Sequence, residues 1–208
     1  MRERKLILLR QLARRRCCES WPDYRHPESY FGFDFRDFVS PYTKSAGNVN
    51  AEVMIVLQDW ASDDGLMKAK PDARLRVSQL GYDPKLRTNK NLERLLKNNF
   101  GLRLSDTYVT NAFPFIKSGN MSAPISTQDV RRAVEMFAVE EIRIVRPRLV
   151  LTLGQRAQKA FQEFRLPPDI IIEQLPHPAA RMSLEEMDAA WGQVAIRRRT
   201  LITREMQF

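Results

Sequence analysis

The apolar run EVMIVL at residues 52–57 leads directly into Gln58, Asp59 and Trp60. A short, continuous apolar run that is rich in β-branched residues is typical of a strand buried on both faces. The sequence therefore predicts a buried strand that ends in polar side chains. Similar apolar runs further along the chain predict three more strands, at residues 107–110, 149–153 and 170–172.

Helical spacing of apolar residues separates the predicted strands. It occurs around Leu92, Leu95 and Leu96, across residues 130–145, in the run QRAQKAFQEF after Gly154, and across residues 184–202. Strands that alternate with helices favour a parallel sheet with helices on both faces. The predicted fold class is therefore α/β, a three-layer α/β/α arrangement around a mainly four-stranded parallel sheet.

The length and composition of the chain fit one domain. It has 208 residues, of which 43% are hydrophobic and 28% charged, without a repeat or a Gly/Ser-rich linker. We expect a single domain over residues 1–208. Within it we predict an N-terminal helix and an aromatic-rich wrapping segment at 1–50, a motif-bearing core at 51–182 and a C-terminal helix at 183–208.

Simple counts exclude several classes of protein. The two cysteines, Cys17 and Cys18, are adjacent, so they cannot join distant segments or supply a four-cysteine iron–sulfur or zinc site. No apolar run approaches the ~20 residues that a membrane-spanning helix needs. The basic N-terminus also lacks the cleavage site of a signal peptide. We expect a soluble, cytoplasmic monomer that contacts no membrane.

The formal net charge of +9 is unevenly distributed. Residues 1–16 carry +6 and residues 197–208 carry +3, so the intervening body is neutral overall. Within that body, residues 68–103 hold ten Lys or Arg against three acidic residues. Such a basic stretch favours a polyanionic partner such as DNA, although solvated helix faces give the same pattern.

Polar side chains follow three of the four predicted strands. Gln58 and Asp59 follow the first, Asn111 follows the second, and His177 follows the fourth, between two prolines. Ligands of open parallel sheets bind at the carboxyl ends of the strands. There Asp59 would orient water or stabilise positive charge, and the amide of Asn111 would read the edge of a base. Each residue alone is an ordinary turn or loop residue, so their convergence is the functional signal.

These residues resemble the motifs of the uracil-DNA glycosylase superfamily. The run VLQDW at 56–60 is similar to the superfamily's strand-end Gly-Gln-Asp-Pro-Tyr-His loop, and Asn111 in YVTNAF matches its strand-end asparagine. The run HPAAR at 177–181 resembles its His-Pro-Ser-Pro loop with a following arginine. Residues 89–92 and 146–154 are similar to the intervening helix entry and the penultimate strand. The resemblance covers residues 50–182.

The resemblance implies a monofunctional DNA glycosylase of base-excision repair. Such an enzyme flips a damaged base, uracil foremost, out of the stack and hydrolyses its N-glycosidic bond. Asp59 would be catalytic by stabilising the oxocarbenium-like sugar and positioning water, and His177 by donating a hydrogen bond to the departing base. The resemblance implies no metal and no organic cofactor.

The resemblance also implies which residues contact the substrate, DNA with a damaged or deaminated base. Gln58, Trp60 and Asn111 would bind the base, and either Tyr82 or Phe113 would stack on it. The expected DNA-binding residues either fill the space left by the flipped base or belong to the basic stretch, and they are Arg181, Met182, Lys85, Arg87 and Lys90.

The chain departs from the superfamily's motifs at four positions. Trp60 and Ala61 replace Pro-Tyr, whose tyrosine excludes the 5-methyl group of thymine in strict uracil enzymes. Leu57 replaces the leading glycine, and Ala179 replaces the serine of the last motif. The sequence therefore leaves thymine exclusion open. The cysteine count excludes the iron–sulfur branch.

Two other functions stay open from the sequence. Asp59, Asp63 and Asp64 could bind Mg²⁺ and hydrolyse a phosphodiester. The chain could instead be a noncatalytic nucleic-acid-binding module that uses the pocket and the basic segments. Activity that a chelator abolishes would favour the first, and salt-dependent binding without base release would favour the second.

Overall fold

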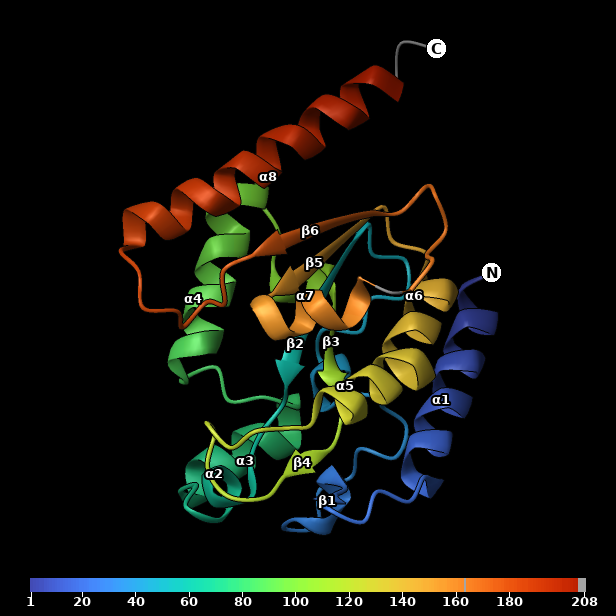
Figure 1. Ribbon diagram of the computed structural model, residues 1–208, viewed down its shortest axis with the longest axis vertical. Coiled ribbons are helices and arrows are strands. Elements are labelled where there is room, and N and C mark those ends of the chain that lie inside the picture. The colour runs from blue at the N-terminus through green and yellow to red at the C-terminus, as the bar shows by residue number, and fades with distance from the viewer. Residues whose placement is uncertain (163, 206–208) are drawn as a thin grey trace.

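The computed structural model describes residues 1–162 and 164–205, and it contains the predicted parallel sheet (Figure 1). Four parallel strands lie in the order β3-β2-β5-β6. Their bounds are Val53–Asp59 for β2, Tyr108–Phe113 for β3, Leu149–Leu153 for β5 and Ile171–Leu175 for β6.

Two of these strands continue further than the apolar runs indicate. Asp59 still pairs with Phe113 across β2 and β3, so Gln58 and Asp59 are the last residues of β2 rather than residues beyond it. Asn111 likewise lies inside β3, opposite Leu57. The backbone ladder is indifferent to side-chain polarity, and it therefore runs past the point where the hydrophobic pattern stops.

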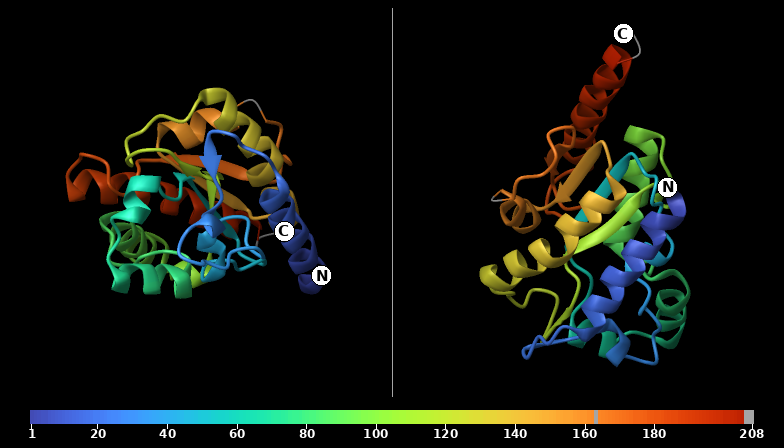
Figure 2. Two further views of the ribbon diagram at one scale, coloured as in Figure 1. Left: turned by 90° about the horizontal axis from the view of Figure 1, so that it is seen from below. Right: turned by 90° about the vertical axis from the view of Figure 1, so that its right-hand side faces the viewer.

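Helices cover both faces of the sheet, which confirms the three-layer α/β/α fold (Figures 1 and 2). One face packs against the N-terminal helix and three helices from the second half of the chain, and the other packs against α4 and α8. The first group is α1 (Arg2–Cys18), α5 (Thr127–Ala133), α6 (Val139–Val145) and α7 (Gln155–Phe161). The second group is α4 (Arg87–Leu95) and α8 (Leu184–Glu205). The last residues of the predicted C-terminal segment, 206–208, lie outside the described residues.

The segment between α1 and β2 wraps around the carboxyl end of the sheet. Its short strand β1 (Tyr24–Arg25) pairs antiparallel with β4 (Ile116–Lys117). Arg16, fully buried at the end of α1, forms an ion pair with Glu28 and donates to the carbonyl oxygens of Phe35 and Phe38. One arginine of the basic N-terminus thus anchors this wrapping segment.

Two helices close to the carboxyl end of β2 have no counterpart among the predicted elements. They are α2 (Asp63–Met67) and α3 (Pro71–Leu80), and α3 ends at Gly81 in the left-handed conformation, with φ of 82°. Their apolar residues show only weak helical periodicity, and α3 buries no residue fully, so the hydrophobic pattern did not predict these helices. Among the described residues, no helix is long and apolar enough to cross a bilayer.

Candidate active site

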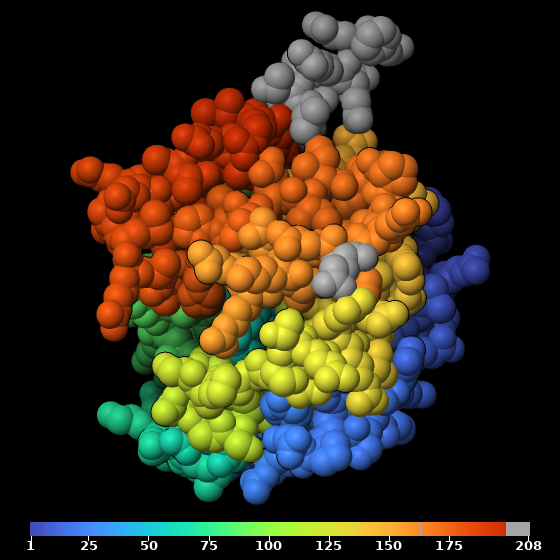
Figure 3. Space-filling model, in the orientation of Figure 1, coloured from blue at the N-terminus to red at the C-terminus, as the bar shows by residue number. Residues whose placement is uncertain are grey.

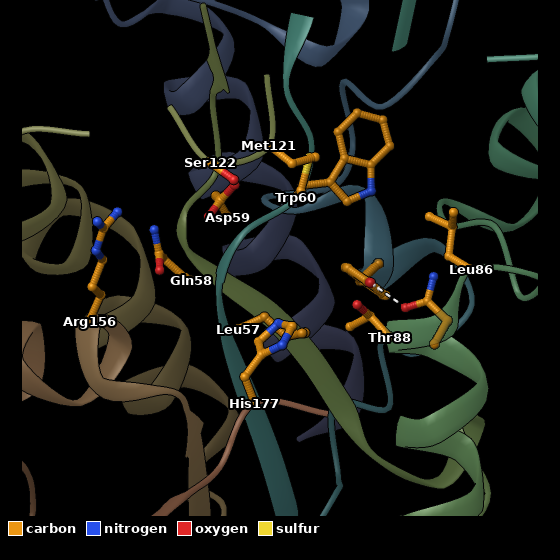
Figure 4. Close-up of a pocket in the computed structure, with 12 residues that line it drawn as sticks. Leu57, Gln58, Asp59, Trp60, Leu86, Thr88, Met121, Ser122, Arg156 and His177 are labelled. Atoms are coloured by element: carbon orange, nitrogen blue, oxygen red, sulfur yellow. Dashed lines mark hydrogen bonds between the residues drawn. The ribbon is translucent and has the colours of Figure 1, made fainter. Parts of the chain in front are cut away.

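A pocket of about 420 Å³ opens at the carboxyl end of β2 (Figure 4). Its volume lies within the usual range for small-molecule sites, roughly 300–1,000 Å³. In the space-filling view the surface is hollowed between the segment around residue 120 and the start of α7 (Figure 3). The pocket is lined by Tyr42, Leu57, Gln58, Asp59, Trp60, Leu86, Thr88, Asn89, Met121, Ser122, Arg156 and His177.

Asp59 forms a buried ion pair with a residue that the sequence interpretation did not include. The Nζ of Lys117, at the end of β4, lies 2.8 Å from Oδ2 of Asp59, and the two side chains are only 2% and 8% exposed. Lys117 also donates to the carbonyl oxygen of Met121 at 2.5 Å. The carboxylate is therefore held from one side and directed at the pocket.

His177 reaches the same pocket from the loop after β6. Its Nδ1 accepts the backbone N–H of Ala179 at 3.1 Å, so the neutral ring carries its proton on Nε2. Burial lowers the pKa of His177 below its usual value of 6.5, and the charge of Asp59 partly opposes that effect. Asn91 on α4 donates to the carbonyl oxygen of Pro178 at 2.7 Å and braces this loop. His177 is thus a neutral hydrogen-bond donor.

Gln58 and Arg156 form another part of the rim, side by side in Figure 4. Together with His177 they also line a second hollow of about 580 Å³ between the ends of β5 and β6. That hollow adds the amides of Gln155 and Gln174 beside apolar residues such as Leu153, so the site continues as a trough with a mixed lining. The pocket is thus a recess, and the trough is an open groove that leads into the pocket.

Tyr42 is the aromatic wall of the pocket on the side of α4. Its hydroxyl donates to Oδ1 of Asn89 at 2.5 Å, and the Nδ2 of Asn89 donates to the carbonyl oxygen of Asp83 at 2.7 Å. Tyr82 stacks on Tyr42 with ring centroids 5.5 Å apart and its hydroxyl bonded to Glu93. Tyr82 therefore supports the wall from behind and does not line the pocket.

Trp60 lines the pocket with its edge, and its ring turns away from His177 (Figure 4). Its Nε1 donates to the carbonyl oxygen of Gly81 at 2.8 Å, and its ring packs against Phe33 and Phe35. The indole is thus fixed by the wrapping segment and by the end of α3. It narrows the pocket without pointing across it.

The structure brings neither Phe113 nor Asn111 to the lining of the pocket. Phe113 is fully buried in an aromatic cluster with Trp21, Tyr24 and Phe115, far into the sheet's other face. Asn111 is also fully buried, because β3 continues past it. Asn111 was expected just past a strand end and instead lies within β3, and Phe113, one of the two candidate stacking aromatics, does not line the pocket.

Asn111 nevertheless keeps a feature that matters for the site. Its Oδ1 accepts the hydroxyl of Ser40 at 2.6 Å, whereas its Nδ2 is buried without a hydrogen-bond partner. Asn111 is in register with Leu57, which lines the pocket, and paired neighbours project to the same face of a sheet. A buried donor left unpaired is costly, so it is poised for a partner on the pocket side.

The five residues expected to bind DNA lie outside the pocket lining. Lys85, Arg87 and Lys90 are exposed at and before the start of α4, on the side where Leu86 and Thr88 form the rim. Arg181 is exposed and Met182 is half-buried, packed against the core under α8. The contact of these five residues with DNA stays a prediction.

The three aspartates considered for a metal site are not brought together. Asp59 pairs with Lys117, Asp63 accepts the Tyr30 hydroxyl at 2.6 Å, and Asp64 pairs with Lys68. Across the described part of the chain, no group of three or more His, Cys, Asp or Glu side chains is arranged to hold a metal ion. This geometry gives no support to the phosphodiesterase alternative.

The sequence interpretation missed half of the pocket. Asn89 occurred in it only as part of a helix entry, and Lys117 did not occur at all. Nothing local marks these residues, because they meet only when four separate segments fold together. The other missed lining residues are Tyr42, Leu86, Thr88, Met121, Ser122 and Arg156.

Comparison with known families provides an independent line of evidence. A family model described as the uracil DNA glycosylase superfamily matches residues 45–198. The matched region contains every pocket-lining residue except Tyr42. No curated protein gives a significant match to the chain.

Proposed function

This chain belongs to the uracil DNA glycosylase superfamily. From that premise we propose that it is a monofunctional DNA glycosylase and that uracil in DNA is the first substrate to test. The reaction would hydrolyse the N-glycosidic bond of a base flipped into the pocket at the end of β2. The proposed scheme uses protein side chains and one water molecule. It would serve base-excision repair.

The carboxylate of Asp59 is the proposed group beneath the sugar. As the glycosidic bond lengthens, the sugar becomes oxocarbenium-like, and a fixed negative charge nearby lowers the energy of that state. The same carboxylate would orient the attacking water. Support comes from the burial of Asp59 and its ion pair with Lys117, which keep the charge in one place.

His177 is the proposed donor to the departing base. A pyrimidine leaves as an anion, and a preorganised donor near its oxygen stabilises that charge. The Nδ1 bond to Ala179 directs the Nε2 proton away from the loop, and the lowered pKa keeps the ring neutral at pH 7. A neutral donor suits this role because it needs no proton transfer to act.

The base-reading groups proposed for the pocket are Gln58 and Asn111. Gln58 lines the pocket directly. The Nδ2 of Asn111, which has no hydrogen-bond partner, would donate to a carbonyl group of the bound base. Tyr42 replaces Tyr82 and Phe113 as the proposed stacking aromatic, since it is the ring that lines the pocket.

The observation that carries the proposal is the meeting of Asp59 and His177 at one pocket. They come from β2 and from the loop after β6, which are 118 positions apart, and both line the same recess. A carboxylate and a neutral donor on either side of a base-sized cavity are the two groups that glycosidic cleavage requires.

Base release from oligonucleotides tests this proposal. The full-length protein would be incubated with oligonucleotides that carry uracil, hypoxanthine or a thymine mismatch, and abasic sites would be revealed by alkaline strand scission. We expect release of uracil that survives a chelator, with losses on the order of 10²–10³-fold in D59N and H177A. The variant D169N, on an exposed aspartate that pairs with Arg146 far from the pocket, is the matched control.

Three results of this experiment would contradict the proposal. Salt-dependent binding of DNA with no release of any base would identify a noncatalytic binding module instead. Release that D59N and H177A leave undiminished would remove the assigned roles. Activity that only a divalent metal restores would favour the phosphodiesterase alternative.

A further inference from the structure

Lys117 is a buried, charged residue beside the pocket that has no role in the reaction proposed above. It ends β4, is 2% exposed, and belongs to a segment that the sequence motifs do not cover. Its ammonium contacts two features of the pocket at once, Oδ2 of Asp59 at 2.8 Å and the carbonyl oxygen of Met121 at 2.5 Å. It does not itself line the pocket.

A buried lysine is costly unless its charge is matched. Removing an ammonium group from water costs several kcal/mol, and one ion pair seldom recovers more than that cost. Stability alone therefore gives little reason for Lys117 and Asp59 to occupy this position. The pair instead holds the carboxylate of Asp59 at one place beside the pocket.

The ion pair also selects which oxygen of Asp59 faces the substrate. Oδ2 is fully buried 2.8 Å from the Nζ of Lys117, in an ion pair that lacks hydrogen-bond geometry, so Oδ1 is the oxygen left for water and for the sugar. Because the lysine comes from the short antiparallel pair β1–β4, its position is fixed by backbone pairing rather than by a mobile loop. The carboxylate plane is thereby set by an element outside the parallel sheet.

The second contact of Lys117 fixes the rim of the pocket. Met121 and Ser122 line the pocket, and the carbonyl bond from Lys117 holds their loop down from inside. A backbone bond from Asp64 to the carbonyl oxygen of Gly119, at 3.0 Å, holds the same loop from α2. Loss of the ammonium would therefore loosen the carboxylate and the rim together.

We propose that Lys117 is a positioning residue for the glycosidic cleavage, which orients Asp59 and couples it to the rim formed by Met121 and Ser122. This inference rests on the proposed function, because it assigns Lys117 to the same reaction. It predicts that Lys117 affects the rate of the chemical step and leaves DNA binding almost unchanged. The proposed positioning role also means that the Nζ of Lys117 forms no covalent bond with the substrate.

The test compares K117M, K117R and K117A with the wild-type enzyme on uracil-containing DNA. Single-turnover rates and DNA dissociation constants are measured for each. We expect K117M to lose on the order of 10²-fold in rate, as misplaced catalytic groups do, with a dissociation constant within about twofold of wild type. K117R, which keeps the charge, should recover part of the loss. Ethylammonium should restore activity to K117A, whereas ethanol should not.

R94M provides a matched control for loss of an ion pair. Arg94 pairs with Asp188 at 2.6 Å between α4 and α8, away from the pocket lining. Its removal should lower stability without changing the rate of the folded enzyme. If K117M does not fold, K117R and the rescue of K117A at low temperature still test the inference.

The outcomes separate this inference from the proposed function. A wild-type enzyme that releases no base contradicts the proposed function itself. An active wild type whose rate equals that of K117M contradicts only the role of Lys117. Borohydride trapping of a covalent protein–DNA adduct that K117M abolishes would show that Nζ attacks the sugar, and would overturn the positioning role.

Discussion

Burial favours the uncharged forms of His177 at the pocket and of Glu141 in the core. It lowers the pKa of His177 at the pocket. It raises the pKa of Glu141 to about 8 in the core, although hydrogen bonds from Thr110 and Tyr108 act in the opposite direction. One neutral group is available for chemistry, and the other is a core acid whose protonation is linked to folding.

The first prediction at this scale concerns the pH dependence of base release. With its pKa lowered below 6.5, His177 stays neutral as the pH falls to that value, and it gains a proton only below it. The part of the rate that depends on neutral His177 should therefore be level from about pH 8 to 6.5 and fall at lower pH. Single-turnover rates and an NMR titration of the imidazole measure this.

H26Q is the control for this profile, since His26 is the other histidine and lies beside Phe115 rather than at the pocket. The decline at low pH should be the same in H26Q as in wild type. A titration of His177 centred at or above pH 6.5 would contradict the prediction.

The second prediction concerns Glu141 and stability. Its carboxyl group stays protonated in the folded state up to about pH 8 but ionises near 4.5 when unfolded. Between those values the folded state binds one more proton, so this group's stabilisation is complete below pH 4.5 and declines as the pH rises towards 8. The slope is at most about 1.4 kcal/mol per pH unit. Urea unfolding at several pH values measures it.

E141Q should flatten that dependence, because an amide keeps the shape of the neutral acid and cannot ionise. Hydrogen bonds to Tyr108 and Thr110 can still form with the amide. Equal pH slopes for E141Q and wild type would mean that Glu141 is already ionised in the folded protein.

At the scale of elements, the end of α3 connects the helix to the pocket wall. Gly81 ends α3 with φ of 82°, and its carbonyl oxygen accepts the indole N–H of Trp60. A Cβ at this position would lie 1.8 Å from the carbonyl oxygen of Pro41. Only glycine lets the helix end here with the 3₁₀ turn Pro41–Lys44 packed against it, and that turn contains Tyr42.

A comparison of G81A with G101A tests this connection. Gly101 also ends a helix in the left-handed conformation, with φ of 66°, but a Cβ there meets nothing within 4 Å. G101A should lose roughly 1–2 kcal/mol of unfolding free energy from backbone strain alone. G81A should lose a further ~1–3 kcal/mol from the clash, measured by urea unfolding. Equal losses would show that the 41–44 turn moves aside without cost.

Across the whole molecule, many of the basic side chains that the structure describes already have a partner. Arg16 and Lys5 on α1 hold the wrapping segment and the carbonyl oxygens of Val49 and Val145. Arg197 and Arg198 on α8 pair with Glu173 and Glu52. In the basic stretch the pattern is similar, since Lys68, Arg76, Arg94 and Arg103 pair with carboxylates. Net charge therefore overstates what is available for DNA.

The exposed residues Lys85, Arg87 and Lys90 are the part of the basic stretch expected to contact phosphates. Binding of DNA should weaken as salt rises, and the triple variant K85A/R87A/K90A should reduce the slope of log K against log salt by about 2–3. Fluorescence anisotropy at several salt concentrations measures the slope. R2A/R4A/R10A on α1, across the molecule from α4 (Figures 1 and 2), is the control and should change it less. The reverse order of the two effects would place the DNA on α1.

Three strands of the sheet, β2, β3 and β5, could be predicted because they are buried on both faces, whereas the edge strand β6 is largely exposed. Such strands need continuous apolar runs, and those runs remain visible in a single sequence. Asp59 and His177 could be predicted with them, because the carboxyl ends of parallel strands share one edge of a sheet. What a hydrophobic pattern cannot show is how far a ladder continues, and Asn111 was therefore expected beyond a strand that includes it.

The aromatic wall shows the limit of inference from neighbouring residues. Tyr82 and Phe113 are close in sequence to predicted motifs, yet one stacks behind the wall and the other is buried in an aromatic cluster. Tyr42 lines the pocket instead, and it belongs to the segment that the sequence predicted only to wrap around the core. Which ring faces a cavity is decided by packing between distant segments.

By itself, the sequence determined the layered fold, the membership of the superfamily and the two groups proposed for chemistry, because burial and strand-end position leave local patterns. Only the tertiary structure decided what surrounds those groups. Lys117 reaches Asp59 because it pairs with Tyr24 between β1 and β4, 93 positions away in the chain, and Asn89 reaches Tyr42 through a hydrogen bond that spans 47. Contacts of that kind depend on the assembled shape, which no local pattern of residues encodes.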